Sequence, residues 1–172
     1  LVSVISASNE IGTLEPLDEI VKIIRKHKSH PYLHVDACQV VRFFDLNTQV
    51  NHIDLITING SKIYGPKGVG VLFVRRGVKI KPLFFGGGQE GGLRSGTLSP
   101  ALCAGFGAAA ALCIKLGASD AQHVEKLWTL AQSLFVGWTL NGSATERWLG
   151  NLNIRLDGLD VARLLSECRT IA

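Results

Sequence analysis

Two charged residues, Lys62 and Asp36, each follow an apolar segment directly, at positions from which a side chain can reach a ligand. Lys62 comes after residues 55–58 and lies in a glycine-rich loop, and Asp36 closes the apolar run 32–35. A partly desolvated lysine amine can attack a carbonyl carbon, and a buried carboxylate needs a cationic or hydrogen-bonding partner. Solvent exposure or a turn explains either residue alone. Together they predict a ligand site, because the ends of adjacent parallel strands meet at one edge of a sheet.

Groups that can bind a phosphate lie next to the lysine in the sequence. Asn59 and Ser61 offer an amide and a hydroxyl immediately before it, and Thr97 offers another hydroxyl. Residues 60–65 begin like a P-loop, but the lysine and the Ser or Thr that must follow its second glycine are missing. Residues 86–91 match a dinucleotide fingerprint, but no helix opens on them and no acidic residue stands about twenty positions later. We therefore reject both nucleotide motifs.

Hydrophobic patterning predicts the elements that position these residues. Residues 1–7, 32–35 and 55–58 have the composition of short buried strands. Apolar residues recur at helical spacing over 16–28, which ends in a basic run suited to a helix C-terminus. This order of strands and helix predicts an α/β fold, a mainly parallel sheet with packed helices.

The second half of the chain is expected to continue the sheet and then leave it. In order, we expect a hairpin of strands 70–75 and 80–85, helices 100–116 and 120–138, a strand 151–156 and a helix 159–168. The pattern changes after Asn141-Gly142. We therefore expect residues 1–140 to form a large domain and residues 141–172 to begin a smaller C-terminal α+β domain.

Composition excludes several classes of protein. The chain has 172 residues, 47% of them hydrophobic and 19% charged, with a net charge of +4 spread along the sequence, so we expect no nucleic-acid partner. No uninterrupted apolar run reaches about 18 residues, so we expect no membrane span. The four cysteines show no metal-binding spacing, which predicts no metal site and a cytoplasmic, reducing setting. The chain opens at Leu1 inside an apparent strand, so we expect a fragment.

Five motifs occur in order and resemble those of one family. They are Asn-Glu-Ile-Gly at 9–12, His-Val-Asp-Ala-x-Gln at 34–39, Ser-Lys-Ile-Tyr-Gly-Pro-Lys-Gly at 61–68, Gly-Gly-Gly-Gln-Glu at 86–90 and Arg-Ser-Gly-Thr at 94–97. This series is similar to the cysteine desulfurase and selenocysteine lyase family, whose members are fold type I enzymes that use pyridoxal 5'-phosphate (PLP). Weaker similarity at residues 150–154 extends the resemblance towards the end of the chain.

The resemblance assigns a role to each candidate site residue. It implies that Lys62 forms the Schiff base with PLP, Asp36 pairs with the pyridine nitrogen, Gln39 contacts the ring hydroxyl, Asn9 lies beside the cofactor, Asn59 and Ser61 serve the phosphate, and Thr97 reaches the phosphate of the partner subunit's cofactor. Ser61 replaces a histidine of many members, and Asn59 a serine or threonine. A homodimer with composite sites is implied.

The activity implied is removal of sulfur from L-cysteine, giving alanine and an enzyme persulfide that a sulfur-acceptor protein uses for iron-sulfur clusters or thiolation. The family's nucleophilic cysteine is expected beyond Ala172, so these residues alone should be inactive. Packing on a helix explains Cys168, and alternation with Asp36 and Gln39 should turn Cys38 away from PLP. Selenocysteine lyase, an inactive scaffold and a fold type I aminotransferase stay open as alternatives.

Overall fold

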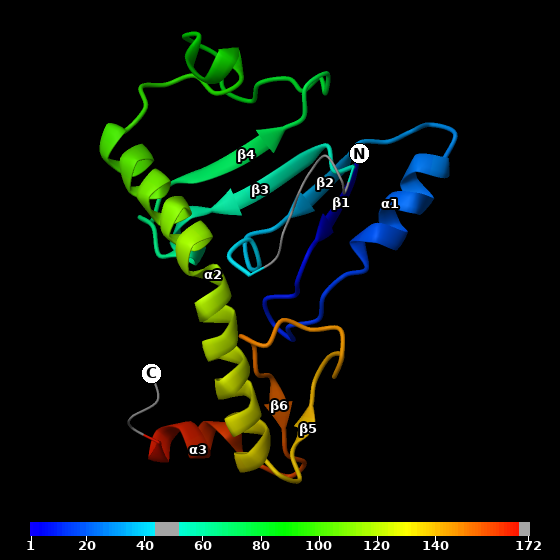
Figure 1. The fold of residues 1–172 in the computed structure, drawn as a ribbon, viewed down its shortest axis with the longest axis vertical. Coiled ribbons are helices and arrows are strands. Elements are labelled where there is room, and N and C mark those ends of the chain that lie inside the picture. The colour runs from blue at the N-terminus through cyan, green and yellow to red at the C-terminus, as the bar shows by residue number, and fades with distance from the viewer. Residues whose placement is uncertain (44–51, 169–172) are drawn as a thin grey trace.

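Short β-branched segments pair into a four-stranded sheet in the computed structural model, which describes residues 1–43 and 52–168. The strands are β1 (Val2–Ile5), β2 (Leu33–Asp36), β3 (Leu55–Asn59) and β4 (Gly70–Val74), in the order β1-β2-β3-β4. β1, β2 and β3 run parallel, and β4 pairs antiparallel with β3 along the edge. The expectation of a mainly parallel sheet is therefore confirmed (Figure 1).

Helix α1 (Leu17–Lys26) covers this sheet and confirms the helix expected from the apolar spacing. Its buried residues Val21 and Ile24 belong to one core cluster with Leu33 and Val35 of β2 and Ile56 of β3. Acidic residues lie in its first turn and basic residues in its last, as the helix dipole favours. This core holds β1, β2 and β3 in register.

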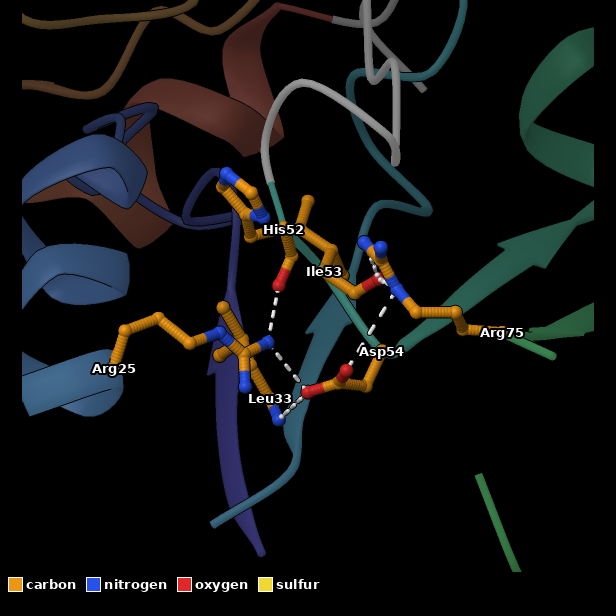
Figure 2. Close-up of polar contacts among 6 residues, drawn as sticks. All are labelled: Arg25, Leu33, His52, Ile53, Asp54 and Arg75. Atoms are coloured by element: carbon orange, nitrogen blue, oxygen red, sulfur yellow. Dashed lines mark hydrogen bonds and ion pairs between the residues drawn. The ribbon is translucent and has the colours of Figure 1, made fainter. Parts of the chain in front are cut away.

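A buried carboxylate, Asp54, joins α1 to the sheet just before β3 begins (Figure 2). Its Oδ2 accepts hydrogen bonds from Nη2 of Arg25 at 2.7 Å and from the backbone N–H of Leu33 at 2.8 Å. Nε of Arg75, which follows β4, lies 3.7 Å from Oδ1 and donates to the carbonyl of Ile53. One side chain thus connects α1, β2, β3 and the end of β4.

The hairpin expected from strands 70–75 and 80–85 is wrong in its second strand. β4 forms as expected, but residues 80–85 contain no strand, and Phe84 and Phe85 are 61% and 83% exposed. β4 already pairs with β3, and Pro82 lacks the N–H that a further ladder would need. Residues 80–98 are consequently loops and one short 3₁₀ turn, η2 (Gln89–Gly92).

The two helices expected at 100–116 and 120–138 are one continuous helix, α2 (Pro100–Leu134). Ser99 caps its start by accepting from the N–H of Leu102. Gly117, which falls between the two expected helices, lies within α2, where a Cβ would come 2.9 Å from the carbonyl oxygen of Arg42. Nε of Arg42 also donates to Asp120 on the next turn, at 2.9 Å. The glycine therefore permits close packing and does not end the helix.

By length and composition alone, α2 is apolar enough to cross a membrane, and it is the one such helix among residues 1–43 and 52–168. Only 6% of its most apolar window is buried inside the described chain. Core helices of soluble proteins pass the same test, so the expectation of no membrane partner stays a prediction.

The remaining elements form a separate small group below the main sheet (Figure 1). Strands β5 (Thr139–Leu140) and β6 (Ile154–Arg155) pair antiparallel, and α3 (Val161–Glu167) follows them. The strand and helix expected at 151–156 and 159–168 are confirmed in shortened form. The proposed domain boundary near residue 140 stays a prediction.

Candidate active site

The carboxyl ends of the three parallel strands lie side by side, and the predicted site residues follow them. Asp36 is the last residue of β2 and pairs in register with Ile5, the last of β1, and with Thr57 of β3. Asn59 ends β3, two residues further on. The loop after β1, the turn after β2 and the turn after β3 therefore meet at one edge of the sheet.

Lys62 is carried by a tight 3₁₀ turn, η1 (Gly60–Ile63), directly after β3. Oδ1 of Asn59 accepts from the backbone N–H of Ser61 at 3.0 Å and from its hydroxyl at 2.9 Å, which caps the turn. Tyr64 closes the turn in the left-handed conformation, with φ 61°. Ile63 is buried while Lys62 is exposed, so the turn is anchored on one side and presents the amine on the other.

Gly60 at the start of this turn is packed too closely for any side chain. A Cβ there would lie 2.8 Å from the carbonyl oxygen of Val69 and 3.1 Å from the ring of Phe106 on α2. The backbone N–H of Gly60 donates to the same Val69 carbonyl at 2.9 Å. The glycine therefore fixes the approach of the Lys62 turn to β4 and α2.

Asp36 is half-buried, and Oδ1 of its carboxylate accepts from the backbone N–H of Cys38 at 3.0 Å. Burial, and next the hydrogen bond to the Asp36 carboxylate and its charge, raise the pKa of the Cys38 thiol to about 12. The positive charge of Lys62 acts on the same thiol in the opposite direction. The charges of Asp36 and Lys62 therefore both influence the pKa of the Cys38 thiol, in opposite directions.

The alternation argument made for Cys38 from the sequence does not apply. The strand ends at Asp36 and the chain enters a run of turns, so side chains no longer alternate. The Cys38 thiol lies by the Asp36 carboxylate and within 3.8 Å of the Thr57 carbonyl oxygen. Gln39, half-buried, lies in the same run of turns.

A polar row beneath Asp36 was not foreseen. The imidazole of His34, two residues earlier on the same face of β2, lies 2.7 Å from the hydroxyl of Ser3 and 2.8 Å from that of Thr57. The two ring nitrogens thus join β2 to β1 and to β3 through side chains, in addition to the backbone hydrogen bonds that already pair these strands. This row fixes the relative position of the strand ends that carry the site.

The loop Asn9–Gly12 after β1 is held by residues far along the chain. Nδ2 of Asn151 lies 3.1 Å from the carbonyl oxygens of both Asn9 and Glu10, and Nδ2 of Asn153 donates to Glu10 at 3.0 Å. The buried Arg147 donates to the next carbonyl, that of Ile11. The Asn9 side chain stays exposed.

Sequence reasoning noted Asn151 and Asn153 only as weak similarity and missed Arg147. The two asparagines lie just before β6 and alternate with Leu152 and Ile154, and such alternation is the one local signal that they could share a polar partner. Nothing in the local sequence around Arg147 distinguishes it from an exposed arginine.

Thr97 lies apart from the strand ends, on the exposed loop that leads to α2. The neighbouring Ser95 is buried and donates to the carbonyl of Phe84 at 3.0 Å, which folds the loop back on itself. The chain therefore brings Asn9, Asp36 and the Lys62 turn to one edge but does not bring Thr97 to that edge by any described contact.

A mainly parallel sheet with an amine, a carboxylate and amides at its carboxyl edge is an α/β architecture suited to binding a ligand, and comparison with known families identifies the family. Residues 1–164 match the model of the class-V aminotransferases, so the chain belongs to that family. Over 177 residues it is 44% identical to the mitochondrial cysteine desulfurase of Saccharomyces cerevisiae, covering all of this chain and 35% of the yeast protein. It is 40% identical over 178 residues to the cysteine desulfurase IscS of Rickettsia typhi, covering 43% of that protein. The chain thus spans less than half the length of these relatives.

Solved structures confirm the fold. A NifS-like protein superposes with a TM-score of 0.87 at 30% identity, over 95% of this chain and 46% of that protein. DndA from Streptomyces lividans superposes with a TM-score of 0.81 at 32% identity, over 98% of this chain and 49% of that protein. These neighbours agree with the expected fold of a type I PLP enzyme.

Proposed function

We propose that this chain carries the PLP-binding part of a cysteine desulfurase. The observation that supports the proposal most directly is the meeting of Lys62, Asp36 and the Asn9 loop at the carboxyl edge of three parallel strands. The names of the relatives agree, since those from yeast and Rickettsia are cysteine desulfurases. A solved relative named SspA, 28% identical, is described in complex with cysteine.

The donor set fits PLP. An exposed primary amine on a rigid turn suits a covalent bond to an aldehyde, and a half-buried carboxylate suits a protonated ring nitrogen. Asn9 and Gln39 offer amide groups to the ring, and Ser61 and Thr97 offer hydroxyls to the phosphate. Oδ1 of Asn59 is occupied by Ser61, so its amide N–H groups are what it offers to the phosphate.

In the proposed mechanism, the amine of Lys62 would hold PLP, and the same amine, when free, would move the proton at the substrate Cα. Bound PLP supplies an electron sink for this step. Asp36 would pair with the ring nitrogen, and its negative charge would favour the protonated form of that nitrogen. An enzyme thiolate attacks the sulfur of L-cysteine, and the S–S bond of the persulfide forms as the Cβ–S bond breaks. Cβ keeps the electron pair of the broken bond and takes up a proton, so the carbon skeleton leaves as alanine.

We propose that the thiolate comes from a cysteine beyond Ala172. A thiol must ionise to attack sulfur, and a pKa of about 12 leaves Cys38 protonated near neutral pH. Burial also raises the pKa of Cys113 on α2. Neither of these thiols is suited to the role.

A homodimer with Thr97 acting across the interface is part of the proposal, as is transfer of the persulfide sulfur to an acceptor protein. The loop that carries Thr97 is rich in exposed apolar side chains, including Leu83, Phe84 and Phe85. Such a patch favours burial against another surface. The cytoplasmic location stays a prediction, because several relatives are named as mitochondrial.

The test compares Lys62→Ala with Lys67→Ala, an exposed lysine on the same loop. Both are made in the full open reading frame that encodes these residues and are incubated with PLP and L-cysteine. We expect Lys62→Ala to lose the visible absorbance of lysine-bound PLP and the formation of alanine, and Lys67→Ala to keep both. Alanine formation by Lys62→Ala at the wild-type rate contradicts the assignment. A keto-acid product in place of alanine supports an aminotransferase, and absence of PLP binding in the wild type supports a scaffold.

A further inference from the structure

Four consecutive carbonyl groups of the Asn9–Gly12 loop are bound by one distant segment, residues 147–153. The carbonyls of Asn9 and Glu10 accept from Asn151 and Asn153, as described above. The carbonyl of Ile11 accepts from Nη2 of Arg147 at 3.2 Å, and that of Gly12 accepts from the backbone N–H of Trp148 at 2.8 Å. No carbonyl of this loop is left to solvent alone, so the loop conformation depends on the distant segment.

Arg147 lies at the centre of this contact and is only 4% exposed. Its guanidinium donates to the carbonyls of Ser143 at 2.7 Å and Asn151 at 2.9 Å in addition to Ile11. The cation lies 4.5 Å from the ring centroid of Trp128 on α2. Burial lowers the pKa of this guanidinium, and none of the ion pairs found in residues 1–43 and 52–168 includes it.

Burying a cation among carbonyl dipoles and an aromatic face costs free energy, and its hydrogen bonds to the carbonyls offset that cost only if their geometry is kept. The loop leaves no room for adjustment. Gly12 has φ +72°, and a Cβ there would lie 2.9 Å from Asn151 and 3.1 Å from Nη2 of Arg147. The guanidinium fork therefore holds the loop, the β5–β6 region and α2 in one fixed arrangement.

We propose that Arg147 is a positioning residue for the cofactor site: it fixes the Asn9–Gly12 loop so that the exposed Asn9 side chain faces bound PLP. The inference rests on the proposed function, because PLP is the ligand in question. Arg147 acts through the loop backbone and Asn9, without touching the cofactor. The small β5–β6 group is thereby part of the machinery that shapes the site.

The test uses Arg147→Met and Arg147→Lys, with Arg155→Met as the matched control. Arg155 lies on the neighbouring strand β6 and is 61% exposed, with one ion pair to Asp157 at 3.9 Å. Two quantities are measured on the protein encoded by the full open reading frame. The first is the hydrogen exchange rate of the Gly12 and Leu14 amides without PLP, and the second is the dissociation constant of PLP, followed by its visible absorbance. Leu14 N–H donates to the carbonyl of Glu146, so it reports directly on the contact.

We expect Arg147→Met to speed hydrogen exchange of both amides about tenfold or more. PLP binding should weaken by about tenfold, because that is the effect of losing one charge-assisted hydrogen bond. Arg147→Lys should recover part of both effects, and Arg155→Met should change neither. A second series in the Asn9→Ala background separates positioning from general loss of structure. If Arg147 acts through Asn9, Arg147→Met costs little further PLP affinity once Asn9 is gone.

An equal loss of PLP affinity in the Asn9→Ala background overturns the inference, as does unchanged exchange in Arg147→Met. A variant that fails to fold is replaced by Arg147→Lys, to which the same two criteria apply. If the wild type binds no PLP, the proposed function itself fails. Wild-type binding with no difference among the variants refutes only the role of Arg147.

Discussion

Removing the carboxylate of Asp54 should destabilise the fold without weakening PLP binding. Asp54 is 6% exposed and lies before β3, whereas Lys62 follows the other end of that strand. Five strand residues separate the two positions, about 17 Å of extended chain. The cluster shown in Figure 2 therefore stabilises the fold and lies far from the proposed PLP site.

The loss in free energy of unfolding can be worked out from the hydrogen-bond and ion-pair partners of the Asp54 carboxylate. Asp54→Ala leaves the buried Leu33 N–H without its acceptor, which costs about 2 kcal/mol. It also removes the pairs with Arg25 and Arg75, whose side chains are 33% and 30% exposed, so together these contribute only about 1 kcal/mol. The total loss is about 3 kcal/mol. Asp54→Asn keeps an acceptor for Leu33 and loses only the charge, so its cost is about 1 kcal/mol.

Urea denaturation followed by circular dichroism gives the free energy of unfolding of both variants. Asp157→Ala is the matched control, since this aspartate is 87% exposed and its ion pair with Arg155 is long, at 3.9 Å. The control should change stability by less than about 0.5 kcal/mol. Equal costs for Asp54→Ala and Asp54→Asn would refute the reasoning, because the Leu33 hydrogen bond is what distinguishes them. A tenfold change in the PLP dissociation constant would refute the claimed remoteness.

Two further outcomes follow from the site geometry. The Cys38 thiol has a pKa raised from 9.0 to about 12, so the folded state favours the protonated thiol; its contribution to stability is complete below pH 9.0 and is lost as pH rises towards 12. Unfolding by urea over this range should show stability falling more steeply in the wild type than in Cys38→Ser, and parallel curves would contradict the assignment. Gly60→Ala should destabilise the protein by about 1–3 kcal/mol and weaken PLP binding, since its Cβ meets the Val69 carbonyl oxygen. Gly107→Ala on α2, where a Cβ meets nothing within 4 Å, should instead stabilise by about 0.5–1 kcal/mol, and thermal melting of both variants checks the pair.

The sequence alone predicted those features that depend on local pattern. Helix α1 follows from apolar spacing and terminal charges, and β1, β2 and β3 follow from short β-branched runs bounded by turns. The meeting of Asp36 and Lys62 at one sheet edge follows from parallel topology, because each closes or follows a strand. The five motifs then indicated the family.

Where local pattern and tertiary contact disagreed, the contact decided the structure. Gly117 ends a helix by propensity, yet α2 continues through it because the glycine lets the helix approach Arg42 closely. Residues 80–85 have strand-like composition, yet no described strand lies beside them to pair with, so they stay a loop. Propensities of this kind amount to about 1 kcal/mol per residue, which a single close packing contact or a missing pairing partner overrides.

Only the tertiary structure could show the contacts that hold the site from a distance. Arg147 and Ile11 are separated by 136 positions, and Asp54 and Leu33 by 21, so the short windows used for local patterns do not contain both partners. An arginine or aspartate has the same local signature whether it is solvated or buried. What distinguishes them is desolvation, and desolvation arises only once remote segments have packed around the side chain.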